Sequence, residues 1–187
     1  MSNHALRPEG PSPDSYSRVT DAARFLGLHR IALERIQQLE SRFRARRTEP
    51  YDQDPDLSQA PSARATVRLE PTDASAAPIT VAFTTFPGIL VRAGQWTMQA
   101  FPACGCDACA ETMDGESQRF LELIDAVVAG RFRESITIPW FGAAKQEWRL
   151  WSPHGSSGGG GSLERSRARE LVNGGARSRD WKPWPSR

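Results

Sequence analysis

Residues 79–101 constrain the fold more than any other stretch of this chain. Three short runs rich in β-branched and aromatic residues follow one another there, separated by breaks that contain glycine. In the third run, apolar Trp96, Met98 and Ala100 alternate with polar residues. A period of two is typical of a strand with one buried face and one solvated face. The stretch therefore predicts an antiparallel meander of three strands.

Two amphipathic helices are predicted on either side of this meander. Apolar residues recur at steps of three and four within residues 21–46, and again within 114–129, which is the spacing of one helix face. Further runs predict a strand at 65–69 and a hairpin made of 135–140 and 145–151. We therefore expect a two-layer α+β fold, in which an antiparallel sheet of four to six strands packs against two main helices.

Both ends of the chain have the composition of unpacked segments. Residues 1–15 are rich in proline and poor in apolar side chains, which predicts a disordered tail. Residues 153–187 begin with a glycine-rich run typical of a flexible linker and continue as an Arg-, Trp- and Pro-rich tail with one short helix. We expect residues 16–152 to form a single α+β domain. Trp181 and Trp184 of the tail could dock either on this domain or on a partner, and the sequence leaves both alternatives open.

Composition limits the classes of function. The formal net charge of +2 is too small to indicate a nucleic-acid or membrane partner by itself. No stretch approaches the roughly 20 consecutive apolar residues of a membrane span, and the first residues lack the apolar core of a signal peptide. We therefore expect a cytoplasmic protein that does not associate with a membrane.

All three cysteines, Cys104, Cys106 and Cys109, lie within six positions in the pattern C-x-C-x-x-C. Their odd number, in a reducing compartment, argues against a disulfide framework. Thiolates at this spacing can converge on one ion where the backbone turns tightly, and Gly105 permits such a turn. Zinc prefers four ligands with sulfur or imidazole donors. The turn thus supplies three zinc ligands and lacks the fourth.

The candidate fourth ligands are Asp107 and Glu111 close by in the sequence, and His154 and His29 farther away. Water in the fourth position would instead make an open site, suited to catalysis. Two other interpretations stay open: three reduced cysteines without a ligand, and a reactive thiol activated by the helix that begins just after the turn. The carboxylates around the turn favour a bound cation over a reactive thiolate, because they raise the pKa of a thiol.

Arginines gather in two places. The end of the first predicted helix and the tail after the glycine run are both rich in arginine, which is typical of solvated segments. A nucleic-acid surface is the alternative, and it requires both segments to form one continuous basic face. The arginines are Arg42, Arg44, Arg46 and Arg47 at the helix end, and Arg165, Arg167, Arg169, Arg177, Arg179 and Arg187 in the tail.

Short motifs along the chain carry a resemblance to a known family. They are Phe86-Pro87-Gly88-Ile89, Gln95-Trp96, the cysteine turn from Pro102 to Cys109, and Ile138-Pro139-Trp140-Phe141-Gly142. In these motifs the chain resembles a family of small uncharacterised actinobacterial proteins, over about Tyr16 to Trp151. The resemblance implies no activity and assigns no role to any residue. The glycine-rich run and the Trp-Pro tail lie outside it.

The residues favour a non-enzymatic module that binds an unidentified protein partner and is stabilised at the cysteine turn by a metal, with zinc as the candidate. No set of acid and base residues converges in the sequence, and neither a catalytic triad order nor a phosphate-binding loop is present. The alternative is an enzyme with an open metal site or a reactive thiol at Cys104, Cys106 or Cys109. A fourth protein ligand would support the structural role, and a cysteine beside a histidine in a pocket would support catalysis.

Overall fold

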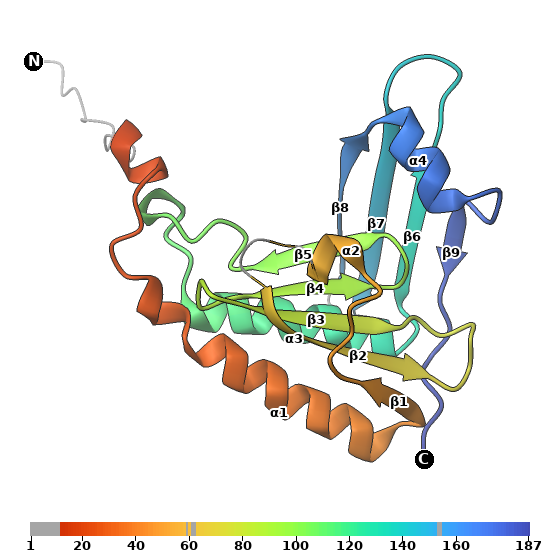
Figure 1. Ribbon diagram of the computed structural model, residues 1–187, viewed down its shortest axis with the longest axis horizontal. Coiled ribbons are helices and arrows are strands. Elements are labelled where there is room, and N and C mark those ends of the chain that lie inside the picture. Colours follow the sequence, from red (N-terminus) through yellow and green to blue (C-terminus); the bar gives the residue numbers. More distant parts are fainter. Residues whose placement is uncertain (1–11, 59, 61–62, 153–154) are drawn as a thin grey trace, which may run out of the picture.

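The computed structural model describes residues 12–58, 60, 63–152 and 155–187 (Figure 1). The predicted α+β class is confirmed, and the strands divide between two antiparallel sheets. One sheet has five strands in the order β1-β2-β3-β4-β5, and the other has four in the order β8-β7-β6-β9. No helix in the described part of the chain is long and apolar enough to cross a membrane.

The first sheet contains the predicted meander. Its strands are β1 (Ala45–Thr48), β2 (Ala63–Pro71), β3 (Ile79–Thr84), β4 (Ile89–Ala93) and β5 (Thr97–Phe101). Val67, Val81 and Val91 stand opposite one another on β2, β3 and β4, and all three are buried. The short segment α2 (Pro55–Ser58) precedes β2.

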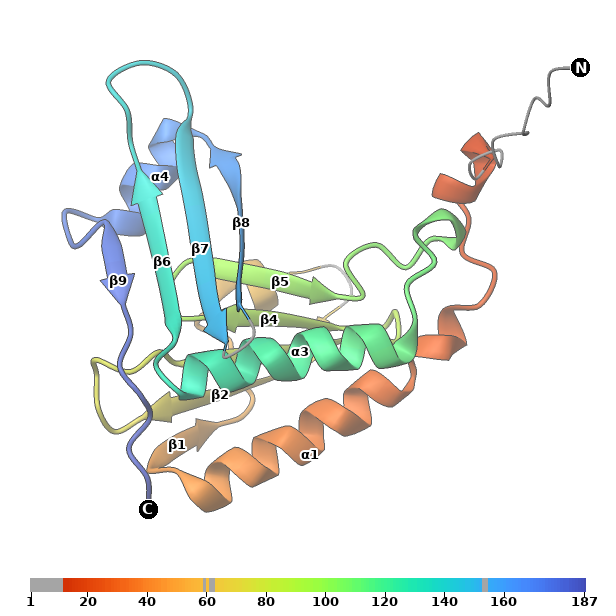
Figure 2. The ribbon, with the colours of Figure 1, turned by 180° about the vertical axis from the view of Figure 1, so that it is seen from behind.

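Two long helices, α1 (Gly27–Arg42) and α3 (Met113–Val128), run side by side on one face of this sheet (Figure 2). The apolar face predicted from the sequence is the face that each helix buries. The buried residues include Leu28, Ala32, Ile36 and Leu39 on α1, and Phe120, Leu123, Ile124 and Val127 on α3. Thr112 caps α3 by accepting the backbone N–H of Gly115, which satisfies a donor that the first turn of a helix leaves free.

The first helix is shorter than predicted at both ends. Residues Ala22–Phe25 form a separate 3-10 turn, η2, capped by Asp21. At the other end Phe43 adopts extended backbone and packs its ring edge-to-face on Trp184, with the ring centroids 5.9 Å apart. This contact joins segments about 140 residues apart, so the helical period alone could not reveal it.

The arginines predicted at the end of the first helix are therefore divided. Arg42 ends α1, but Arg44 lies beyond it and Arg46 and Arg47 belong to β1. The prediction that these arginines form the end of the first helix is therefore wrong for Arg44, Arg46 and Arg47. The side chains on β1 pair with carboxylates, Arg46 with Glu70, and Arg47 with Glu40 and Glu49.

The second sheet stands across one end of the first (Figures 1 and 2). It contains β6 (Phe132–Thr137), β7 (Ala144–Ser152), β8 (Gly155–Leu163) and β9 (Ser178–Asp180), with α4 (Arg165–Val172) between the last two. The predicted hairpin is confirmed as β6 and β7. A small core forms between this sheet and α4, from Trp96, Ile136, Ala144, Ala168 and Val172.

The glycine-rich run is a strand rather than the flexible linker that its composition predicted. All nine residues of β8 pair with β7, from Ala144 opposite Leu163 to Ser152 opposite Gly155. Ladder hydrogen bonds come from the backbone and need no side chain. Because glycine has no side chain, β8 can also lie close to β7: a Cβ at Gly160 would be 2.4 Å from the carbonyl oxygen of Gln146.

A buried carboxylate joins the two sheets. Glu134 on β6 is fully buried and accepts hydrogen bonds from the backbone N–H groups of Gln95, Trp96 and Thr97, at 2.7, 2.9 and 2.9 Å. The indole of Trp181 donates to the same carboxylate at 3.1 Å. Burial raises the pKa of Glu134, and the backbone donors oppose that rise. One side chain thus fixes the β4–β5 turn and the C-terminal segment against β6.

The two tryptophans of the C-terminal tail dock on the rest of the molecule, which is one of the two alternatives that the sequence left open. Trp181 and Trp184 both belong to the main core, and the indole N–H of Trp184 donates to the carbonyl of Ala77 at 2.8 Å. Of the predicted N-terminal tail, residues 1–11 lie outside the described residues, and Pro13–Tyr16 form a 3-10 turn, η1.

Candidate metal centre at the cysteine turn

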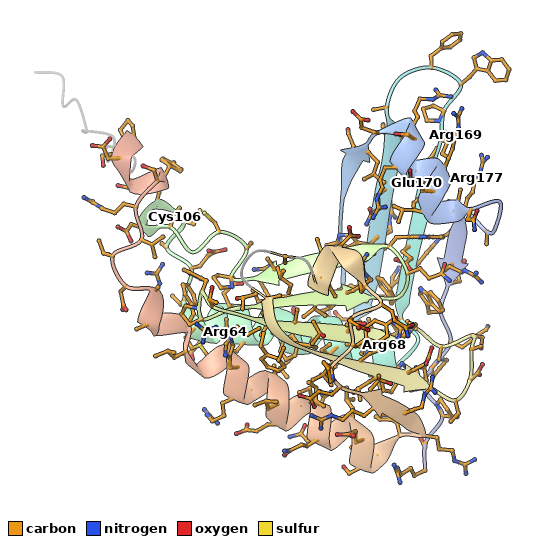
Figure 3. All side chains as sticks on the ribbon, in the orientation of Figure 1. Arg64, Arg68, Cys106, Arg169, Glu170 and Arg177 are labelled. Atoms are coloured by element: carbon orange, nitrogen blue, oxygen red, sulfur yellow. The ribbon has the colours of Figure 1, made fainter. Side chains whose placement is uncertain are left out.

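The cysteine turn connects β5 to α3 at the end of the first sheet that lies away from the second sheet (Figure 3). The 3-10 turn η3 (Asp107–Cys109) forms its second half. Gly105 has a φ of +81°, and a Cβ there would lie 2.8 Å from Cζ of Phe86. Glycine is therefore required at this position by both backbone conformation and space.

This backbone brings all three thiols together. The Sγ atoms of Cys104, Cys106 and Cys109 lie within 4.8 Å of one another. Thiolates around a tetrahedral zinc ion stand roughly 3.8 Å apart, given a Zn–S bond of about 2.3 Å. Cys106 is 3% exposed, whereas Cys104 and Cys109 are exposed. The three cysteines are therefore close enough to hold a metal ion that solvent can reach.

None of the thiols is consumed in a disulfide. All three cysteines are free, and the sulfurs of Cys106 and Cys109 lie 3.3 Å apart. Hydrogen bonds from the neighbouring thiols, that of Cys104 first, lower the pKa of Cys106. The hydrogen bond with Cys106 raises the pKa of Cys109 to about 12. Of these two thiols, that of Cys106 therefore loses its proton at the lower pH.

Glu111, expected as a candidate fourth ligand, organises the turn instead. Its carboxylate accepts the backbone N–H groups of Ala103, Cys104 and Gly105, at 3.1, 3.2 and 2.6 Å. Both carboxylate oxygens take part in these bonds. The side chain therefore holds the first half of the turn in the shape that presents the thiols.

Asp107, the second nearby candidate, binds the segment that leads into η2. Its carboxylate accepts the backbone N–H of Thr20 at 2.9 Å, the hydroxyl of Thr20 at 3.1 Å and Nε of Arg18 at 3.2 Å. These donors, the backbone N–H of Thr20 first, lower the pKa of Asp107. Arg24 adds a hydrogen bond to the carbonyl of Gly105 at 3.0 Å.

The histidines complete the set of candidates. Nε2 of His29 lies 2.8 Å from the carbonyl oxygen of Gly88, and its ring packs edge-on against Phe83. His154 lies outside the described residues. Among the residues that the structure does describe, no histidine or carboxylate joins the three cysteines as a fourth ligand.

Sequence reasoning missed the residues that hold the turn in place. Arg18, Thr20 and Arg24 are about 80 to 90 residues away from it in the chain, and nothing in their spacing points to the cysteines. The backbone N–H groups that donate to Glu111 could not be predicted either, since nearly every residue carries such a group.

Comparison with known proteins gives one match. A family model described as "Family of unknown function (DUF6226)" matches residues 3–187. This match extends beyond the resemblance expected over about Tyr16 to Trp151, and it takes in the glycine-rich strand and the C-terminal tail. The comparison with curated proteins found no match, and neither did the comparison with solved structures.

Proposed function

Since the chain belongs to this family, whose function is unknown, we propose from its own geometry that it is a non-enzymatic binding module whose cysteine turn holds one zinc ion. The convergence of Cys104, Cys106 and Cys109 carries this proposal. Three thiolates form a soft donor set, which suits zinc and excludes magnesium and calcium, since these prefer oxygen ligands.

The fourth ligand in this proposal comes from water or from a group outside the described residues, His154 included. Asp107 and Glu111 are already engaged by other donors. These two carboxylates then act around the site: Glu111 shapes the turn, and Asp107 ties the segment with Arg18 and Thr20 to it. Partners of this kind orient metal ligands in known sites.

A structural role for zinc fits the position of the turn better than catalysis does. The turn joins β5, α3 and the segment before η2, so a bound ion would stabilise the junction of all three. The described residues place no imidazole with the thiols to act as a general base, and the nearby carboxylates are occupied. The proposed site also needs reduced thiols, which places the protein in a reducing compartment such as the cytoplasm.

The test is metal content, measured by elemental analysis on protein purified without a metal-affinity tag. We expect about one zinc per chain and its loss in Cys106→Ser. Replacing zinc with cobalt should give the intense visible absorption of a tetrahedral thiolate site, which reports ligand type independently of stability. Asp114→Asn is the matched control, because it changes an exposed acid and leaves the three thiols, Asp107 and Glu111 in place. Metal-free protein with three freely titrating thiols, and no cobalt spectrum after reconstitution, would contradict the proposal.

A further inference from the structure

The loop between β6 and β7 presents two large aromatic side chains to solvent. Trp140 is 85% exposed and Phe141 is 83% exposed. Trp184, by contrast, is 3% exposed in the main core. Two adjacent aromatic rings left in water represent a substantial apolar area that folding does not bury. A contiguous exposed apolar patch of this kind marks an interaction site.

The loop is held in this shape by α4. Nη1 of Arg165 donates to the carbonyl oxygens of Pro139 at 2.8 Å and Trp140 at 3.0 Å, and it lies 3.4 Å from that of Gly142. Arg165 therefore fixes the backbone that carries the two rings. An aromatic pair on a fixed loop loses less conformational entropy on binding than one on a loose loop.

A basic groove of about 470 Å³ lies at the foot of this loop. Ile138, Pro139, Trp140 and Val172 contribute apolar lining, and Arg165, Arg169 and Arg177 supply the charge. Among the residues that the structure describes, no carboxylate lines the groove. Figure 3 labels Arg169 on α4 and Arg177 on the segment before β9, both on the same side of the second sheet.

Two of these arginines are available to a ligand. Arg169 and Arg177 are exposed and form no ion pair with any described residue. Arg167, on the same helix as Arg169, differs in this respect, since it forms ion pairs with Asp56 and Glu170. The positive charge of the groove is therefore local and uncompensated.

We propose that the groove and the two aromatic rings together bind an acidic segment of a partner protein, one that carries an apolar side chain beside its carboxylates. Tryptophan and arginine are the residues that most often dominate protein interfaces. Guanidinium groups pair with carboxylates through two parallel hydrogen bonds. The apolar wall and the aromatic rings would receive the apolar side chain.

Charge favours a protein segment over a nucleic-acid strand. A phosphate backbone needs a track of cations, but carboxylates interrupt the basic surface beside the groove. Glu170 follows Arg169 on α4, and Asp180 pairs with Arg133 on the neighbouring strand. A short acidic peptide needs only the local cluster of arginines, whereas an extended polyanion would also meet these carboxylates.

This inference rests on the binding role proposed above, but it does not depend on the metal. The cysteine turn and the groove lie at opposite ends of the molecule in Figure 3. Binding should therefore be equal for zinc-loaded and chelator-treated protein, as long as both are folded. A protein that takes up no zinc at all but still binds the peptide would contradict the metal proposal alone.

The probe is a displayed library of random short peptides, selected on the full-length chain. We expect enrichment of peptides that combine Asp or Glu with an aromatic or large aliphatic residue. Affinity of a selected peptide, measured by fluorescence anisotropy, should fall about tenfold or more in Trp140→Ala with Phe141→Ala. The double variant Arg169→Glu with Arg177→Glu should reverse the charge preference and select basic peptides, which a misfolded protein would not do.

Controls separate this site from the alternatives. Arg133 pairs with Asp180 and does not line the groove. Arg133→Glu should therefore leave peptide affinity within about twofold. The inference is overturned if no peptide is enriched, if the enriched peptides lack acidic residues, or if both double variants bind them as well as the parent does. It is also overturned if these variants lose affinity for an oligodeoxythymidine strand or for anionic lipid vesicles while their peptide binding is unchanged.

Discussion

At the cysteine turn, the carboxylate of Glu111 holds the backbone that carries the thiols. Glu111 accepts three successive backbone N–H groups, from Ala103 to Gly105, and so stabilises a conformation that no regular secondary structure would supply. The sequence showed Glu111 as an acid at ligand spacing and could not show which donors it meets. Three thiols at C-x-C-x-x-C spacing were predictable as a cluster, because their separation in the chain limits how far apart they can lie.

Replacing Glu111 with glutamine should weaken metal binding without removing a ligand. The amide group of Gln directs an N–H toward backbone N–H donors, so part of the turn loses its acceptor. We expect zinc affinity to fall roughly 10- to 100-fold, measured by competition with a chromophoric chelator. Asp114→Asn is the control, since it removes one negative charge from an exposed acid nearby. Equal losses in both variants would mean that net charge, rather than the shape of the turn, sets the affinity.

At the scale of elements, hydrophobic periodicity located the helices and strands that bury one apolar face. The two long helices, the meander and the β6–β7 hairpin could all be predicted, because each buries one patterned face. β8 could not, because glycine and serine carry no such pattern and the strand is held by the backbone of β7. β1 and β9, with four and three residues, are too short for a period to show and depend on their neighbours.

Two glycines of β8 should differ sharply in their tolerance of a side chain. A Cβ at Gly160 would lie 2.4 Å from the carbonyl oxygen of Gln146, whereas nothing lies within 4 Å of a Cβ at Gly161. We expect Gly160→Ala to lower the free energy of unfolding by about 1–3 kcal/mol. Gly161→Ala should leave it unchanged or raise it slightly, because alanine restricts the unfolded chain. Urea denaturation measures both, and equal values for the pair would show that β7 and β8 do not approach this closely.

Across the whole molecule, Trp181 and Trp184 near the C-terminus pack in the same hydrophobic core as the buried residues of α1. Trp184 packs on Phe43 and donates to the carbonyl of Ala77, and Trp181 donates to Glu134, the carboxylate that joins the two sheets. The sequence left open whether the two tryptophans dock on this chain or on a partner, and it could not show their contacts, because each contact joins segments far apart in sequence. The family match over residues 3–187 includes this tail.

The six tryptophans allow a matched test of burial. Trp184→Ala should lower the free energy of unfolding by about 3–5 kcal/mol, because it removes a buried indole and leaves a cavity. Trp140→Ala should change it by no more than about 0.5 kcal/mol, because that ring lies in solvent. Chemical denaturation followed by far-ultraviolet circular dichroism compares the two. A large loss in Trp140→Ala would mean that the exposed loop supports the fold, and the binding role inferred for it would then lose its basis.

The strand of glycine and serine also ends a sheet, since β8 has a neighbour only on the β7 side. An open sheet edge invites pairing with strands of other molecules, which is a common start of aggregation, and proteins usually guard it with charged side chains or proline. β8 has neither over Gly155–Ser162. An added strand would also find no side chains here to fix its register, so several alignments along β8 would be open to it. The lack of side chains that brings β8 so close to β7 thus leaves the outer edge of the sheet open to strands of other molecules.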